Sequence, residues 1–161
     1  MSEYYATVRW KRDASEDFSN SKYSREHRWE FDGGAVVMAS PSPHIVPAPH
    51  SVAAHVDPEE AFVAALSSCH MLFFLSLVAK RRWTVDQYAD NAVGLMSKDS
   101  RGLLAMTEVT LCPAVRFSGE RMPTRDDVAH IHHQAHEHCF IANSVKTVVA
   151  VKPVFSERTS P

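Results

Sequence analysis

Apolar and polar residues alternate near the start of the chain, which is the pattern of a β-strand with one face in solvent. In residues 5–11, Ala6, Val8 and Trp10 are apolar, whereas the residues between them are polar. A period of two places all the apolar side chains on one face of an extended chain. The pattern therefore predicts a first strand over this segment.

A β-hairpin and a long loop are predicted next. A second strand over residues 22–31 is followed by Asp32, Gly33 and Gly34, a turn signal, and residues 35–39 form the short partner strand. Residues 40–55 contain four of the nine prolines. Each proline removes a backbone donor and biases the preceding residue away from the helical conformation. This segment is therefore expected to be an extended loop.

The strongest pattern in the sequence is that of a long apolar helix. Asp57 is a good N-cap, Pro58 suits the first helical position, and Glu60 follows the cap by three residues. Residues 61–79 contain no Asp, Glu, Lys or Arg, and three cations at 80–82 close the segment. Cations are favourable at the negative end of a helix dipole. The pattern predicts a helix that begins after Asp57 and ends at these cations.

This helix is apolar nearly all round, so we expect it to be buried. At about 36 Å it is as long as an 18 kDa globule is wide, and a second subunit would make its burial easier. It is barely long enough to cross a membrane. We predict no membrane span, because polar residues interrupt the helix at Ser67, Ser68, His70 and Ser76.

The second half of the chain predicts further strands and one more helix. Long strands are expected over residues 88–98 and 103–117, with a polar turn over 97–102, and a last strand over 146–153. Between them, Thr124 caps a helix whose inner stripe is formed by Val128, Ile131, Ala135 and Cys139. Strands and helices in this order predict an α+β fold in a single domain, residues 1–161.

Composition narrows the classes of function. The chain has 161 residues, 45% of them apolar, and a formal charge of −2. This charge gives no bulk attraction to nucleic acid or to an anionic membrane, so neither is expected as a partner. Three cysteines exclude a disulfide-rich secreted scaffold, and the chain opens with no signal-peptide pattern. We expect a cytoplasmic protein without a cofactor.

The three cysteines differ in what they can do. Cys112 precedes a proline in an apolar strand and is interpreted as a packing residue. Cys69 lies in the middle of the first helix and Cys139 at the end of the second helix's inner stripe. These two are either packing residues as well or a reactive pair of inward-facing thiols. Composition alone leaves both interpretations open.

A reactive Cys69 must be a thiolate, and its position is unfavourable for one. It lies twelve residues past the N-cap, beyond the reach of the helix dipole, and burial favours the neutral thiol. A cation is therefore required: Arg25 is the first candidate and Arg28 the second, with His27 and His70 weaker. Glu59 is the candidate carboxylate to hold the arginine.

The position of Glu59 points to a second subunit. Glu59 lies about 15 Å before Cys69 along the helix, so the two cannot easily share a site in one subunit. A two-fold dimer could bring Glu59 and an arginine of one subunit to Cys69 of the other.

Taken together, these residues resemble the OsmC/Ohr family of peroxide reductases. The resemblance rests on Asp57-Pro58-Glu59-Glu60 leading through Ala64-Ala65 to Cys69, with Cys139 seventy residues later, after a helix. It implies an intertwined α+β homodimer with antiparallel sheets around a long buried central helix. Asp57, His70 and Phe140 stand where the family usually has asparagine, an aromatic residue and proline, which indicates a divergent branch.

The resemblance also implies an activity, the reduction of organic hydroperoxides to alcohols. Cys69 takes the peroxidatic place and becomes a sulfenic acid. Cys139 takes the resolving place and forms a Cys69–Cys139 disulfide, which an external dithiol recycles. Glu59 takes the place of the carboxylate that positions the arginine.

Histidines suggest an alternative function. Five of the ten lie on the second predicted helix, where His132 and His136 have a spacing that can hold a metal and are predicted to line the active site. His130 and His133 are predicted to face solvent. His70 points about 100° away from Cys69 and is not expected to pair with it directly. The alternative is a dimer of the same fold without peroxidase activity, either structural or binding a metal through His and Cys.

Overall fold

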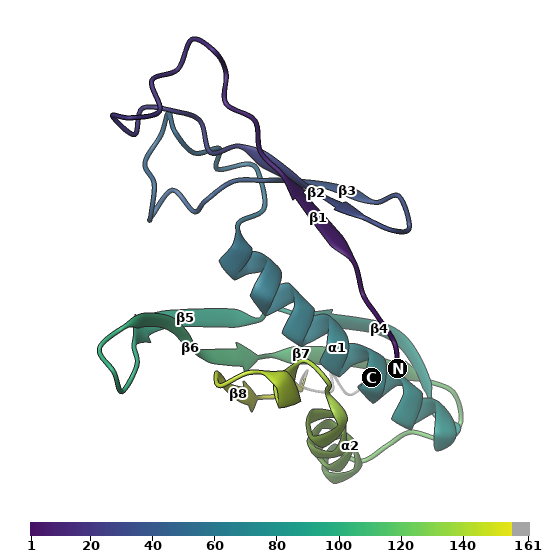
Figure 1. Ribbon diagram of the computed structural model, residues 1–161. Helices are drawn as coiled ribbons and strands as arrows, with labels where there is room; N and C mark the ends of the chain where they lie inside the picture. Colours follow the sequence, from purple (N-terminus) through teal and green to yellow (C-terminus); the bar gives the residue numbers. More distant parts are fainter. Residues whose placement is uncertain (156–161) are drawn as a thin grey trace. The chain divides into compact units, whose positions relative to one another are not determined.

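The computed structural model describes residues 1–155 and groups the chain into two compact units, Met1–Ala61 and Phe62–Pro161. Each unit is described by itself below. The sequence-based division into one domain stays a prediction. The α+β class and the predominantly antiparallel pairing are confirmed, with helices and strands in the predicted order (Figure 1).

The first unit holds a three-stranded antiparallel sheet in the order β1-β2-β3. Its strands are β1 (Ala6–Arg9), β2 (His27–Phe31) and β3 (Val36–Ala39). Gly34 turns the β2–β3 hairpin with a φ of 85°, a conformation that glycine adopts without steric cost. Residues 40–55 form the predicted loop, in which Ser40 Oγ accepts a hydrogen bond from Val52 N at 2.8 Å.

The strand predicted over residues 22–31 begins later than expected, at His27. The backbone N–H groups just before His27 donate to segments other than a neighbouring strand. Ser24 N donates to the carboxylate of Glu16 at 2.8 Å, and Arg25 N donates to His50 O at 3.1 Å. These bonds hold the preceding residues away from the β1 edge, so they do not extend the sheet.

Helix α1 (Pro58–Lys80) begins and ends where the sequence predicts. Asp57 Oδ1 accepts from Glu60 N at 2.7 Å, and Glu60 Oε2 accepts from Asp57 N at 3.2 Å. This reciprocal capping box satisfies two backbone donors that a helix start would otherwise leave unpaired. By length and apolar composition α1 could also cross a bilayer, a property that core helices of soluble proteins share.

Replacing Asp57 with alanine is expected to lower the free energy of unfolding by about 1 kcal/mol, because Glu60 N then loses its partner. Urea unfolding of Asp57→Ala and Asp57→Asn would measure the effect. The asparagine variant keeps an oxygen at the cap and should lose only a few tenths of that energy. Equal losses in both variants would contradict the capping role.

One stripe of α1 is buried within the chain rather than the whole circumference. The buried residues recur every four positions and are Leu66, His70, Phe74 and Val78. The prediction of burial on all sides is therefore wrong for a single chain: Leu72, for example, is 61% exposed. Phe74 and Val78 pack against the second helix, whereas Leu66 packs against a sheet.

The second unit contains two separate sheets. One pairs β4 with β7, and the other has the order β5-β6-β8. Their strands are β4 (Thr84–Asp90), β5 (Val93–Lys98), β6 (Leu104–Leu111), β7 (Pro113–Ser118) and β8 (Val148–Val151). Strand β8 runs parallel to β6. Parallel strands need a long crossover connection, and here the connection includes the second helix.

Each of the two long predicted strands is in fact broken into two. The first breaks after Asp90 and the second at Cys112, so that the halves pair in different sheets. A hydrogen bond joins the two break points, because Asp90 Oδ1 accepts from Cys112 N at 2.6 Å. Pro113 follows directly and has no backbone donor, which permits the change of sheet.

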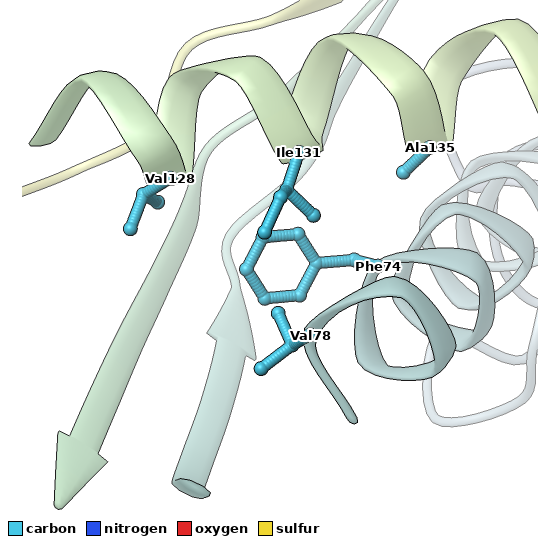
Figure 2. Close-up of a cluster of buried hydrophobic side chains, with 5 residues drawn as sticks. All are labelled: Phe74, Val78, Val128, Ile131 and Ala135. Atoms are coloured by element: carbon cyan, nitrogen blue, oxygen red, sulfur yellow. The ribbon is translucent and has the colours of Figure 1, made fainter. Parts of the chain in front are cut away.

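Helix α2 (Arg125–His138) packs its inner stripe against α1. Figure 2 shows Ile131 of α2 above the ring of Phe74, with Val78 of α1 on the other side of that ring. Thr124 and Asp127 form a second capping box. The predicted inner stripe is confirmed, because Val128, Ile131, Ala135 and Cys139 are all buried.

Candidate active site

The second unit brings Cys69 and Cys139 together, although 69 residues separate them in the sequence. Cys69 lies halfway along α1 and is partly buried, and Cys139 is the C-cap residue of α2 and almost fully buried. Both are free thiols, and their side chains are hydrogen-bonded to each other. Ala142 N approaches Cys139 Sγ at 3.5 Å, at the start of the short 3₁₀ helix η1 (Ala142–Ser144).

The environment makes the two sulfurs unequal. Burial raises the pKa of the Cys139 thiol to about 11, and the hydrogen bond to Cys69 adds to this rise, whereas the amide of Ala142 opposes it. Cys139 is therefore protonated at neutral pH.

Aromatic rings stand beside the thiol pair. Phe73 follows Cys69 by one helical turn, and Phe140 follows Cys139 directly. The two rings meet edge to face with centroids 4.9 Å apart. Phe140 is 70% exposed, so the rings give the thiols an apolar border that is open to solvent.

A buried histidine pair links α1 to α2 one residue beyond Cys69. His70 Nε2 and His132 Nδ1 are 3.0 Å apart, and neither residue is accessible to solvent beyond 2%. The rings lie parallel, 6° apart, and His132 stacks on Phe74 at 4.1 Å. The other ring nitrogens, His70 Nδ1 and His132 Nε2, are buried without a partner.

Both histidines are held neutral. Burial lowers the pKa of His70 to about 4, with a further decrease from His136 and an opposing effect of Asp90. Burial likewise lowers the pKa of His132 to about 3, and His70 adds to this. A neutral imidazole is both a donor and an acceptor, which is what a hydrogen bond between two histidines requires.

The sequence predicted that His132 and His136 flank the inner stripe, but it did not predict that His132 pairs with His70. A usable signal existed: His70 is a polar residue on the buried stripe of α1, and buried polar groups in proteins have partners. The same reasoning applies to Ser67, whose Oγ donates to Asp90 at 2.6 Å.

The predicted arginines lie in the first unit and differ in their partners. The guanidinium of Arg25 lies 4.2 Å from the ring centre of Tyr23 and donates to the carbonyls of Tyr23 and Ser21. Arg28 is bound to the carboxylate of Glu30 at 2.7 Å on an exposed face. Of the two, Arg25 keeps its charge uncompensated by a carboxylate within residues 1–155.

Arg25 also lines a pocket of about 520 Å³ within the first unit. Aromatic and apolar side chains surround it, among them Trp10, Phe18 and Tyr23, whose rings contact one another. Glu59 stands in the first turn of α1. The predicted action of Arg25 and Glu59 on Cys69 stays a prediction.

The second predicted helix does not assemble a metal site as it stands. Among the residues that the structure describes, no group of three or more His, Cys, Asp or Glu side chains is disposed to hold a metal ion. His132 is already hydrogen-bonded to His70. His133 faces solvent, with its Nε2 3.4 Å from Glu137 Oε1. His132 and His136 instead line a pocket of about 240 Å³ next to Val149 and Val151.

Comparison with known proteins places these residues in context. The family model for OsmC-like protein matches residues 51–153, a stretch that contains α1, α2 and both thiols of the pair. An OsmC-like protein of unknown function from Vibrio cholerae O1 biovar eltor is 58% identical to this chain. Its structure superposes with a TM-score of 0.94, over 96% of this chain and all of that one.

More distant structures share the fold alone. An organic hydroperoxide resistance protein from Elizabethkingia anophelis has a TM-score of 0.64 at 14% identity, covering 94% of this chain and 95% of that one. The organic hydroperoxide resistance protein OhrB of Bacillus subtilis has a TM-score of 0.61 at 18% identity, covering 96% and 98%. No functionally curated protein is a significant match to the sequence.

Proposed function

The chain belongs to the OsmC-like protein family, and on this premise we propose that it reduces organic hydroperoxides to alcohols with Cys69 and Cys139. The observation that carries the proposal is the contact between the two thiols, one of them kept protonated by burial. Two free cysteines in contact are the minimum that a dithiol peroxidase needs. The third cysteine, Cys112, lies at the break between β6 and β7 and has no part in this proposal.

The difference between the sulfurs assigns their roles. Cys139 is buried and protonated, whereas Cys69 is only partly buried, so Cys69 serves as the nucleophile. Its thiolate attacks the terminal oxygen of the hydroperoxide, the O–O bond breaks, and the departing alkoxide takes up a proton to leave as alcohol. Cys69 is oxidised to a sulfenic acid, and the peroxide is reduced by the same two electrons.

Cys139 then resolves the sulfenic acid. Its sulfur attacks Cys69 Sγ, the S–O bond breaks, and the hydroxyl leaves as water with the proton that Cys139 gives up. The product is the Cys69–Cys139 disulfide, which an external dithiol reduces by thiol–disulfide exchange. Because the two sulfurs are already in contact, this step requires little movement of α2.

An arginine would favour the Cys69 thiolate and stabilise the charge that moves onto the peroxide oxygens. We assign this role to Arg25, because Arg28 is held by Glu30, a carboxylate that it shares with Arg9. Since α1 is continuous from Pro58 to Lys80, Glu59 lies about 15 Å from Cys69 along the helix axis of its own chain. The proposal therefore includes a two-fold homodimer in which Glu59 and Arg25 of one subunit serve Cys69 of the other.

Exposed apolar surface supports this homodimer. Leu72 on α1 is 61% exposed, and Val8 and Val36 of the three-stranded sheet are 64% and 58% exposed. Burying such side chains would contribute roughly 25 cal/mol per Å² of apolar surface. A second copy of the chain that covers α1 would also restore the all-round burial that its composition predicts.

The substrate class follows from the border of the thiol pair. Phe73 and Phe140 offer apolar contact area but few polar groups, so they favour a hydroperoxide with an apolar substituent over hydrogen peroxide. Cumene hydroperoxide has this chemistry.

The wild-type protein is expected to consume cumene hydroperoxide in the presence of dithiothreitol, with kcat/KM at least about tenfold higher than for hydrogen peroxide. Without reductant, mass spectrometry of digested protein should show a Cys69–Cys139 disulfide after one equivalent of peroxide. Cys112→Ser is the matched control and should keep full activity. No peroxide consumption, or a disulfide that includes Cys112, would overturn the proposal in favour of a non-peroxidatic protein with the same fold.

A further inference from the structure

The buried histidine pair is a directional connection inside a contact that is otherwise apolar. Around it, Phe74 and Val78 of α1 pack on Val128, Ile131 and Ala135 of α2. Apolar contact is nondirectional, so by itself it specifies the register of two helices less sharply than a hydrogen bond does. The bond between His70 and His132 requires a short N···N distance and an N–H aimed at the acceptor, and the two nitrogens are 3.0 Å apart. It therefore fixes the register of α2 along α1.

The His70–His132 pair does little to stabilise the folded state. Both side chains lose their contact with water on folding, and His70 Nδ1 and His132 Nε2 have no hydrogen-bond partner in the folded protein. A buried polar atom without a partner costs about 1–3 kcal/mol, and two apolar side chains of similar shape would avoid that cost. Buried polar pairs of this kind are understood in several proteins as fixing one arrangement among several similar ones.

The arrangement that this pair fixes is the one in which the thiols meet. His70 follows Cys69 directly on α1, and His132 stands about two turns before the C-cap residue Cys139 on α2. A slip of α2 by one turn along α1 would move Cys139 by about 5.4 Å and separate the sulfurs. The bond between Ser67 and Asp90 fastens α1 to the end of β4, so α1 cannot follow such a slip freely.

We propose that His70 and His132 are positioning residues, whose hydrogen bond holds Cys139 in register with Cys69 for disulfide formation. This role rests on the thiol pair of the proposed function, but it does not depend on which oxidant the protein meets. Within residues 1–155 neither imidazole is hydrogen-bonded to Cys69 or Cys139, so the pair acts through the helices.

Diamide tests this role without peroxide. This oxidant takes two electrons and two hydrogens from a pair of thiols, is reduced to the hydrazine, and leaves a disulfide. The rate at which diamide closes the Cys69–Cys139 bond thus reports how well the thiols are positioned. Peroxide consumption, measured separately, reports the proposed function, so the failure of either is recognised by itself.

Two variants separate positioning from stability. His70→Leu/His132→Leu removes both partners at once, and we expect its resistance to urea to be preserved or raised. Its disulfide should nevertheless close at least about tenfold more slowly than that of wild type. His132→Asn keeps a polar atom near the place of Nδ1 in a smaller side chain, so it should lose stability but close within about twofold of the wild-type rate.

A purely structural role predicts the opposite pattern, in which the closing rate follows stability in both variants. That pattern, or a double variant that closes as fast as wild type, would overturn the proposal. A wild-type protein that diamide cannot convert to the Cys69–Cys139 disulfide would overturn it as well. Slow closure by a stable double variant, with fast closure by His132→Asn, supports it.

Discussion

Cys69→Ser is expected to abolish hydroperoxide reduction, with kcat/KM falling by about a thousandfold or more. A serine hydroxyl is not ionised at neutral pH, and it cannot form the sulfenic acid that splits the reaction into two steps. The measurement is the consumption of cumene hydroperoxide with dithiothreitol as reductant. Folding should be unaffected, because a hydroxyl replaces a thiol of similar size on a partly buried face of α1.

Cys139→Ser is the informative companion to this variant. It should still reduce one equivalent of peroxide per Cys69 and accumulate a sulfenic acid, which dimedone would trap. Turnover should then depend on how well the external dithiol reaches Cys69. Full steady-state activity of Cys69→Ser, or a trapped sulfenic acid on Cys139 of the wild type, would contradict the assigned roles.

Acidification is expected to remove several kcal/mol from the free energy of unfolding between pH 6.5 and pH 4. In the folded state the pKa of His70 lies at about 4 and that of His132 at about 3, whereas an unfolded histidine titrates near 6.5. The folded protein thus binds fewer protons than the unfolded chain in this window. Above pH 6.5 the histidines are neutral in both states, and as the pH falls from there toward the folded pKa values the unfolded chain takes up protons first and stability is lost.

The magnitude follows from the size of the shift. A decrease from 6.5 to about 4 corresponds to about 3 kcal/mol for His70 alone. Carboxylates with lowered pKa values, such as Asp99 and Asp127, lose their contribution below about pH 5, so the upper part of this window reports the histidines.

Urea unfolding at pH 7, 6, 5 and 4 measures this loss. His70→Leu/His132→Leu is the matched control, and its unfolding free energy should vary much less with pH across the same range. An equal dependence on pH in both proteins would show that other groups cause the acid sensitivity. A wild-type protein of constant stability from pH 7 to 4 would contradict the burial of two neutral histidines.

The helices were predictable because their signals are local. The cap at Asp57 and the cap at Thr124 act on residues three positions away, and the inner stripe of α2 repeats within four. The breaks in the two long predicted strands were not predictable in this way. They depend on Asp90 accepting from Cys112 N across 22 residues, a bond that forms only once both sheets are assembled.

The residues of the candidate site also differ in whether the sequence or only the structure could identify them. The resemblance to the OsmC/Ohr family singled out Cys69 and Cys139 from the sequence, and the structure brings them into contact. The pairing of His70 with His132 was missed because adjacent-residue geometry on one helix says nothing about a partner 62 residues away. For Arg25 and Glu59 the sequence remains the source of the assignment.

The sequence by itself determined where the helices start and stop and which stripe of α2 faces inward. These properties depend on side chains within one or two turns of each other. Only the tertiary structure decided that one thiol is buried and protonated while its neighbour is only partly buried, and that two neutral histidines tie the helices together. Burial and desolvation arise when distant segments exclude water from the same space, and no local pattern carries that information.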